Sequence, residues 1–197
     1  TIIPEKTCFL NIDMQNCFVA NSPVAVENGL DLAEELNKFA QECRDKGILV
    51  VHTAHVTRPG NQNTGIMGEL SPTVKGGMIE DGLISAALHE NIIIKDEDII
   101  LKKPRFGAFH STDLELILRS KGIDTVIIGG IATNVCCETT AREANVRDFM
   151  VVFLSDGTKT FDLGEVKAEE IQKVVCATIN MFFGRVHTMK ETLDMMK

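Results

Sequence analysis

The sequence predicts one α/β domain over residues 1–197, folded as a three-layer α/β/α sandwich around a mostly parallel, six-stranded, Rossmann-like sheet. Two observations lead to this class. The chain has 197 residues, 44% of them hydrophobic, which is enough for one sizeable core. Short, unbroken aliphatic runs alternate with amphipathic stretches of helical period. Strands that are buried on both faces of a parallel sheet have such continuous apolar sequences.

The first half of the chain contains three of the expected strands. They cover residues 7–12, 48–51 and 98–101, each a short apolar run. A helix is expected over residues 29–46, because its apolar residues recur at helical spacing and Gly47 follows as a helix-ending glycine. We expect residues 56–82 to form a long loop, since they are rich in Gly, Pro and Asn without a clear period. A loop of this length in a compact domain is usually functional.

The second half continues the alternation, and it supplies the remaining strands and helices. The expected strands cover residues 125–128, 149–154 and 185–188, and the expected helices cover residues 111–122, 136–144 and 165–183. Right-handed crossovers between parallel strands place these helices on the two faces of the sheet.

Composition excludes several classes of function. The net charge is −8 and no stripe of Lys and Arg is present, so nucleic acid is not an expected partner. No apolar run reaches the roughly 18 residues of a membrane span, and the first residues lack the apolar core of a signal peptide. The six cysteines are scattered rather than arranged as a disulfide framework. We therefore expect a cytoplasmic protein with free thiols.

Three reactive side chains follow different predicted strands. Asp13 ends the first strand, Lys103 follows the third, and Cys136 lies just beyond the fourth at the start of a helix. The carboxyl ends of parallel strands share one edge of the sheet, where ligands bind, so these side chains are expected to meet. A helix start lowers the pKa of a thiol. Asp13 could then act as the base and Lys103 could stabilise the charges.

Each of these residues also has a purely structural explanation. Cys136 could be a small buried hydrophobic residue, and Asp13 could cap a turn at the end of a strand. Only one of Lys102 and Lys103 can face the site, because side chains alternate along a strand. The neighbouring Cys137 shares a small apolar helix face with the alanines at positions 141 and 144, so we expect it in the core.

Three motifs together resemble the isochorismatase-like cysteine hydrolases, a family that includes nicotinamidases, N-carbamoylsarcosine and ureidoacrylate amidohydrolases, and biuret hydrolase. The motifs occur in the right order over nearly the whole chain. They are Asp13-x-Gln15-Asn16-x-Phe18, Lys103-x-Arg105-Phe106-x-Ala108-Phe109 and Gly130-x-Ala132-Thr133-Asn134-x-Cys136.

The resemblance implies a role for several residues. Asp13, Lys103 and Cys136 match the catalytic triad, with Cys136 as the nucleophile. The backbone amides of Ala132 and Cys136 match the oxyanion hole, and a non-proline cis peptide bond is expected between residues 131 and 132. Phe18 matches a position that packs against the substrate. The resemblance also implies a homodimer or homotetramer and a reaction that needs no cofactor.

Some positions depart from the family pattern. Cys17 and Gly107 stand where members commonly have Asp and Ser. Nicotinamidases carry an Asp-x-His sequence and further histidines after the second strand, whereas this chain has only His52 and His55 there. Three positions apart in a strand, these two side chains point to opposite faces, so we expect no metal site.

The expected substrate is a small amide or ureide, cleaved at its C–N bond through a thioester. Arg58 and Arg105 are candidates for binding a substrate carboxylate, with a salt bridge at the rim as the alternative. We expect His110 to cap a helix or lie at the surface. Two other functions remain open: hydrolysis of a vinyl ether, as in isochorismatases, and a non-catalytic binding or regulatory role.

Overall fold

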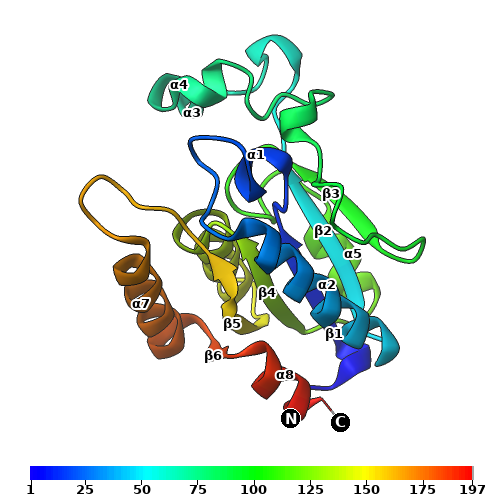
Figure 1. Cartoon of the computed structure of the whole chain (residues 1–197). Helices are drawn as coiled ribbons and strands as arrows, with labels where there is room; N and C mark the ends of the chain where they lie inside the picture. Colours follow the sequence, from blue (N-terminus) through cyan, green and yellow to red (C-terminus); the bar gives the residue numbers. More distant parts are fainter. Residues whose placement is uncertain (197) are drawn as a thin grey trace.

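The computed structural model describes residues 1–196 and contains one six-stranded sheet, in which all neighbouring strands are parallel (Figure 1). The strand order is β3-β2-β1-β4-β5-β6. The strands are β1 (Thr7–Ile12), β2 (Leu49–His55), β3 (Ile99–Lys103), β4 (Thr125–Ile131), β5 (Met150–Lys159) and β6 (Arg185–His187). All six expected strands are present, and the order reverses direction between β1 and β4.

Helices cover both faces of the sheet, which confirms the three-layer architecture. One face packs on α2 (Gly29–Asp45) and α8 (Met189–Met195). The other face packs on α5 (Leu114–Ser120), α6 (Glu138–Asn145) and α7 (Ala168–Thr178). Adjacent residues of β1 divide between the two cores, with Phe9 on the α2 side and Leu10 on the α5–α7 side. This alternation is what a strand buried on both faces requires.

Shorter elements connect these layers. The remaining helical turns are α1 (Asn16–Val19), α3 (Ile66–Leu70), α4 (Pro72–Lys75), η1 (Pro4–Lys6), η2 (Pro59–Asn61), η3 (Ile84–Ala86), and the π-helical turns η4 (Thr133–Cys137) and η5 (Ile179–Phe183). Several helix boundaries differ from those expected: α5 begins at Leu114 rather than near residue 111, and α7 begins at Ala168 rather than at residue 165. The last long helix ends at Thr178 and continues as η5, and the helix near Cys136 begins earlier, as η4.

Four strands run further than their aliphatic segments. One of them, β3, continues to Lys103. β2 continues to His55, β4 to Ile131 and β5 to Lys159, because the neighbouring strands still offer backbone partners there. Gly130 permits this extension of β4. It has a φ of +119° and lies opposite Ile12 of β1, where any Cβ would collide with the Ile12 carbonyl oxygen.

Residues 56–82, here called the arm, are not the structureless loop that their composition predicted. The arm contains η2, α3 and α4, and Figure 1 shows it standing beyond the sheet, above α1. A parallel bridge between Thr57 and Glu80 closes its base. Its buried residues Met67, Val74 and Ile79 pack against Cys17 of the body. The arm is therefore attached to the body both at its base and through a small apolar cluster.

All six cysteines are free thiols, as expected. Within residues 1–196, no helix combines the length and the apolar character that crossing a membrane demands.

Candidate active site

The three predicted reactive side chains do meet, beyond the carboxyl ends of the strands. Asp13 directly follows β1, Lys103 ends β3, and Cys136 lies in η4 just after β4. The strand order reverses between β1 and β4, which is where a crevice opens in such sheets. Lys103 Nζ lies 2.8 Å from Asp13 Oδ2, with both side chains fully buried. A carboxylate oxygen of Asp13 lies within 4.8 Å of Cys136 Sγ.

Thr53 of β2 fixes the orientation of the Asp13 carboxylate. The backbone N–H of Asp13 donates to the Thr53 carbonyl at 3.2 Å and to its Oγ1 at 3.1 Å. The Thr53 hydroxyl in turn donates to Asp13 Oδ1 at 2.6 Å. In the described residues 1–196, no well-aligned donor reaches Oδ2, although the Lys103 ammonium lies beside it. This oxygen is therefore available to accept a proton.

Lys103 is held as a cation. Its ammonium donates to the carbonyls of Arg105 at 3.0 Å and Phe106 at 2.8 Å. Burial alone lowers the pKa of this amine, but interactions with Asp13 and Cys136 outweigh burial, so the Lys103 pKa is raised. The adjacent Lys102 points elsewhere and pairs with Asp81 at the surface, at 2.9 Å. The alternation expected of two neighbouring strand residues is confirmed.

Cys136 differs from the sequence prediction in its protonation. Burial raises its pKa well above the ordinary value. Lys103 acts in the opposite direction, but Asp13 raises the pKa further, so the ion pair offers no large net positive charge. The expectation of a lowered thiol pKa was wrong, because it considered the helix start without the surrounding apolar wall. In this structure Cys136 is a thiol beside a carboxylate.

Two other expectations near Cys136 are confirmed. Cys137 is fully buried and packs in the core with Ala141 and Ala144. The peptide bond between Ile131 and Ala132 is cis.

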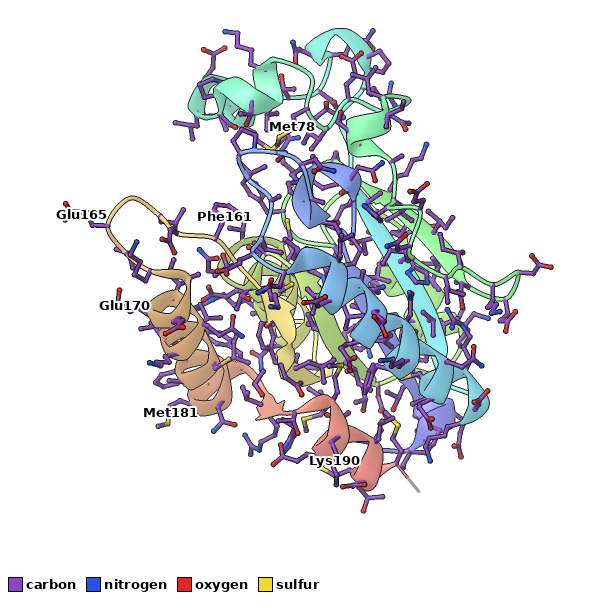
Figure 2. The ribbon with its side chains drawn as sticks, viewed as in Figure 1. Met78, Phe161, Glu165, Glu170, Met181 and Lys190 are labelled. Atoms are coloured by element: carbon purple, nitrogen blue, oxygen red, sulfur yellow. The ribbon has the colours of Figure 1, made fainter. Side chains whose placement is uncertain are left out.

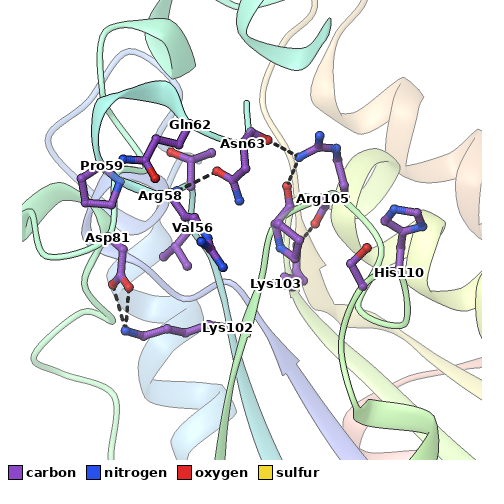
Figure 3. Close-up of a pocket in the computed structure, with 13 residues that line it drawn as sticks. Val56, Arg58, Pro59, Gln62, Asn63, Asp81, Lys102, Lys103, Arg105 and His110 are labelled. Atoms are coloured by element: carbon purple, nitrogen blue, oxygen red, sulfur yellow. Dashed lines mark hydrogen bonds and ion pairs between the residues drawn. The ribbon is translucent and has the colours of Figure 1, made fainter. Parts of the chain in front are cut away.

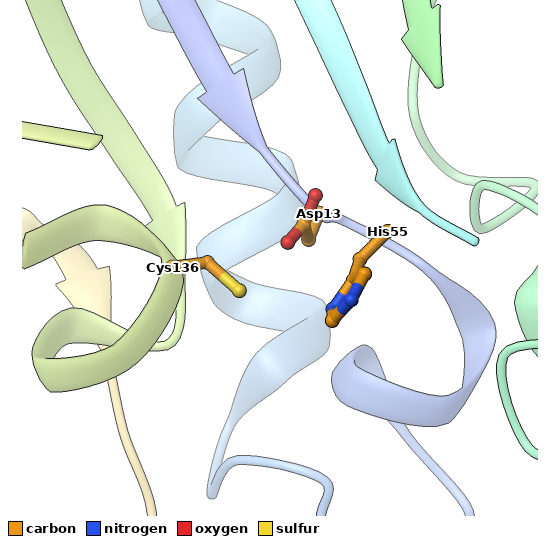
Figure 4. Close-up of side chains that lie close together, drawn as sticks. All are labelled: Asp13, His55 and Cys136. Carbon is orange, nitrogen blue, oxygen red and sulfur yellow. The ribbon is translucent and has the colours of Figure 1, made fainter. Parts of the chain in front are cut away.

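His55 is the site residue that the sequence reasoning missed. It is 2% exposed, and one of its ring nitrogens lies within 4.8 Å of both the Asp13 carboxylate and Cys136 Sγ (Figure 4). Burial, followed by the nearby Lys103 ammonium, lowers the pKa of His55 to about 3. A longer prediction for β2 would have revealed His55. When β2 extends to residue 55, His55 pairs in register with Lys103 of β3.

The backbone of His55 is bound on both sides by Gln15. The side-chain oxygen of Gln15 accepts from the His55 backbone N–H at 2.7 Å. The side-chain nitrogen of Gln15 donates to the His55 carbonyl at 3.0 Å and to the Ala86 carbonyl at 2.7 Å. His52, on the opposite face of β2 as expected, instead bonds to Asn11 and Asp98.

Asp13, His55 and Cys136 together offer three ligand atoms that could hold a metal ion. The Lys103 ammonium, however, already lies against the only carboxylate of this group. A divalent cation would have to be bound beside that positive charge, which disfavours it electrostatically.

An apolar cavity of about 140 Å³ opens onto Cys136. Phe18, predicted to contact the substrate, lines it, and Figure 2 marks two further lining residues, Met78 of the arm and Phe161 after β5. The remaining lining residues are Val24, His55, Ser71, Thr73, Val74, Ile79, Phe106, Ile131, Ala132 and Val135. The wall is thus almost entirely apolar around the thiol.

A second, polar cavity of about 670 Å³ lies next to the first, and it contains Arg58 and Arg105 (Figure 3). Arg105 Nη1 donates to the carbonyls of Asn63 at 2.9 Å and Pro104 at 2.7 Å. The exposed His110 lines this cavity as well. The structure therefore brings Phe18 to Cys136 but places both arginines in the neighbouring cavity, and their binding of a substrate stays a prediction.

The two departures from the family pattern have structural counterparts. The Glu143 carboxylate occupies the space that a side chain at Gly107 would need, and it accepts the backbone N–H of Phe109 at 3.0 Å. Cys17 lies in the apolar cluster beneath the arm, where burial raises its pKa to about 12.

Comparison with known proteins agrees with this geometry. Residues 7–191 match the model of the isochorismatase domain. Ureidoacrylate amidohydrolase RutB of Enterobacter sp. (strain 638) is 28% identical over 213 residues, covering 98% of this chain and 90% of that protein. A cysteine hydrolase of Pseudomonas syringae pv. phaseolicola superposes with a TM-score of 0.88 at 31% identity, covering 97% of this chain and 92% of the other.

An isochorismatase-like hydrolase from Alkaliphilus metalliredigens superposes with a TM-score of 0.82 at 27% identity, covering 96% of this chain and 98% of the other. The matched domain spans every strand of the sheet and all four residues of the site. The chain belongs to the isochorismatase family of hydrolases.

Proposed function

We propose that this hydrolase cleaves the C–N bond of a small amide or ureide through a thioester on Cys136, with Asp13 and Lys103 completing a catalytic triad. The observation that carries the proposal is a buried thiol beside a buried carboxylate whose Oδ2 is free to accept a proton. The similarity to an amidohydrolase and to a cysteine hydrolase supports the same chemistry.

Acylation begins with proton transfer from Cys136 to Asp13 as Sγ attacks the substrate carbonyl carbon. The thiol is protonated in the free enzyme, so this transfer accompanies attack rather than preceding it. The carbonyl oxygen becomes an oxyanion, which the backbone amides of Ala132 and Cys136 would stabilise. The Lys103 ammonium, 2.8 Å from Asp13 Oδ2, offsets the negative charge that develops on sulfur.

Collapse of this intermediate breaks the C–N bond. The nitrogen leaves with the proton held by Asp13, and the acyl group remains on Cys136 as a thioester. Water then attacks the thioester, Asp13 takes a proton from that water, and the sulfur departs and is reprotonated. The products are an acid and ammonia or an amine. The reaction as written consumes only substrate and water.

The decisive experiment compares hydrolysis of a panel of small amides and ureides by wild type, Cys136→Ser and Cys137→Ser. We expect Cys136→Ser to lose at least about 10⁴-fold in kcat, since removal of a nucleophile costs that much or more. Cys137→Ser serves as the matched control, because Cys137 is a core residue one position away. Mass spectrometry of the quenched wild type should find the acyl group on the peptide that contains Cys136.

Equal turnover by wild type and Cys136→Ser would refute the mechanism. Hydrolysis of isochorismate that survives Cys136→Ala would indicate vinyl-ether chemistry instead. No turnover of any substrate by a folded wild type would favour a binding or regulatory role.

We also infer a homodimer or homotetramer in the cytoplasm. Free thiols support the reducing compartment. Exposed apolar side chains on the arm, Ile66 and Leu70, support burial against another subunit. Sedimentation velocity on the purified protein tests the oligomeric state.

A further inference from the structure

The His55 imidazole has no role in the mechanism above, although it belongs to the wall of the reaction cavity. It lies edge-on to the Phe106 ring, with 5.4 Å between the ring centres. Its Nε2 is buried and has no hydrogen-bond partner within residues 1–196. A buried polar atom without a partner is costly in a folded protein, so a ligand that completes its hydrogen bonding is the natural explanation.

Whether Nε2 donates or accepts a hydrogen bond depends on whether the other ring nitrogen, Nδ1, carries the proton. The Pro104 backbone raises the pKa of His55, which is the effect of an accepting carbonyl near the ring. Because Nε2 has no partner within residues 1–196, we assign the ring proton to Nδ1. The pKa of about 3 keeps the ring neutral at physiological pH. In a neutral ring with its proton on Nδ1, Nε2 offers a lone pair. His55 therefore presents an acceptor to the cavity.

Few other side chains of this cavity can accept a hydrogen bond from a substrate. Most of the lining is apolar, and its other polar side chains, Ser71 and Thr73, come from the arm. Asp13 Oδ1 is already bonded to Thr53. Among the described residues next to the thiol, Asp13 Oδ2 lies against the Lys103 ammonium, and His55 Nε2 has no partner.

We propose that His55 Nε2 accepts a hydrogen bond from the N–H of the scissile nitrogen, which makes the site selective for amides and ureides over esters. The distances allow it, since the Asp13, His55 and Cys136 atoms all lie within 4.8 Å of one another. The bond turns the nitrogen lone pair toward Asp13, which delivers the leaving-group proton. This inference rests on the proposed C–N hydrolysis and assigns a specificity-determining residue to it.

The test compares His55→Phe, His55→Gln and wild type on a matched pair of substrates. The pair is the best primary amide of the panel and the methyl ester of the same acid, which lacks the N–H. We expect His55→Phe to reduce kcat/KM for the amide about 30-fold while changing that for the ester less than about threefold, because only the amide loses a buried hydrogen bond. His55→Gln, whose amide oxygen can accept, should recover most of the amide activity.

Equal losses on the amide and the ester would overturn the inference and leave His55 a packing residue. An unchanged amide rate would also overturn it. A wild type that hydrolyses neither substrate would instead refute the proposed function, and Cys136→Ser must lose both substrates if that function is right.

A measurement without turnover complements the kinetics. In Cys136→Ser, ¹⁵N NMR of the histidine side chains should show an unprotonated His55 Nε2 at pH 7. Addition of the primary amide should shift this resonance, and addition of the methyl ester should not. A proton on Nε2 would overturn the inference even if the variants were too unstable for kinetics.

Discussion

Two neighbouring cavities of this enzyme differ in almost every physical respect. The smaller one, about 140 Å³, is apolar and contains Cys136. The larger one, about 670 Å³, is polar and contains Arg58, Lys102 and Asp81. Residues 103–106 contribute to both, because Lys103 and Arg105 line the polar cavity and Phe106 lines the apolar one.

Under the proposed mechanism the reaction takes place in the smaller cavity, although the other is larger and more charged. In the polar cavity Lys102 and Asp81 form an ion pair at the surface. In the apolar cavity a few polar atoms lie among apolar side chains, where each unpaired group has a large energetic effect. Matched substitutions in the two cavities should therefore differ sharply.

The largest difference is expected between the aspartates of the two cavities. Asp13→Asn should reduce amide hydrolysis about 10³-fold, since it removes the base. Alkylation of Cys136 by iodoacetamide at pH 8 should nevertheless become faster, because Asp13 raises the thiol pKa while Lys103 lowers it. Peptide mass spectrometry can follow this labelling separately from that of the other cysteines.

Asp81→Asn is the control for that experiment and should leave both rates within about twofold. Slower labelling in Asp13→Asn than in wild type would contradict our description of the electrostatics. Urea denaturation should accompany the rates, because the variant leaves the Lys103 ammonium buried without its partner.

The second-largest loss of activity is expected when an apolar contact in the smaller cavity is removed. Phe18→Ala should lower kcat/KM about 30-fold, because the loss of one large apolar wall residue costs roughly 2 kcal/mol of binding. Gln62→Ala in the polar cavity should change it less than about twofold. Steady-state kinetics on the best amide checks both, and similar losses in the two variants would make the polar cavity part of the substrate site.

His55 in the apolar cavity should affect the stability of the protein in acid. The folded pKa of His55 is about 3 and its ordinary value is 6.5, so the unfolded chain binds a proton first as the pH falls. Stability from this group is therefore complete above pH 6.5 and is lost toward pH 3, by about 2 kcal/mol between pH 7 and pH 5.

Urea denaturation at pH 7 and pH 5 measures that loss. His55→Phe should lose less stability than wild type on acidification, and Gln62→Ala in the polar cavity should behave like wild type. Both variants retain the buried His52, whose pKa is also lowered, so it does not affect the comparison. An equal loss in all three proteins would show that His55 is protonated in the folded state.

The smallest effect is expected from Arg58. If the polar cavity receives a carboxylate at the far end of the substrate, Arg58→Ala should raise KM for a carboxylate-bearing amide about tenfold and leave a neutral amide unchanged. The exposed Arg185 of β6 provides the control substitution. An unchanged KM for the charged amide would confine substrate to the apolar cavity.

The sequence was sufficient to predict the sheet and the meeting of Asp13, Lys103 and Cys136, because strand ends in a parallel sheet share an edge. It failed for His55, because the aliphatic run of β2 stops at Val51 while the backbone pairing continues to His55. The raised Cys136 pKa depends on walls contributed by distant segments, which no local pattern contains.

Two helices that were not predicted begin with capping residues that are visible in the sequence. The unpredicted α8 begins with Thr188 and Glu191, whose side chains form a capping box, and α4 begins with Ser71 as cap before Pro72. The contact between Gly107 and Glu143, in contrast, joins residues far apart in the chain and had no sequence signal.

The arm can change in sequence, and with it the substrate preference, while the residues proposed to carry out the reaction stay the same. It joins the body at the Thr57–Glu80 bridge, yet it supplies Ser71, Thr73 and Val74 to the wall of the cavity that contains Cys136. Exchange of this segment between relatives would alter the shape of the reaction cavity and leave the sheet, the ion pair and the thiol untouched. Diversification of such enzymes can therefore proceed by grafting one insertion onto an unchanged catalytic frame.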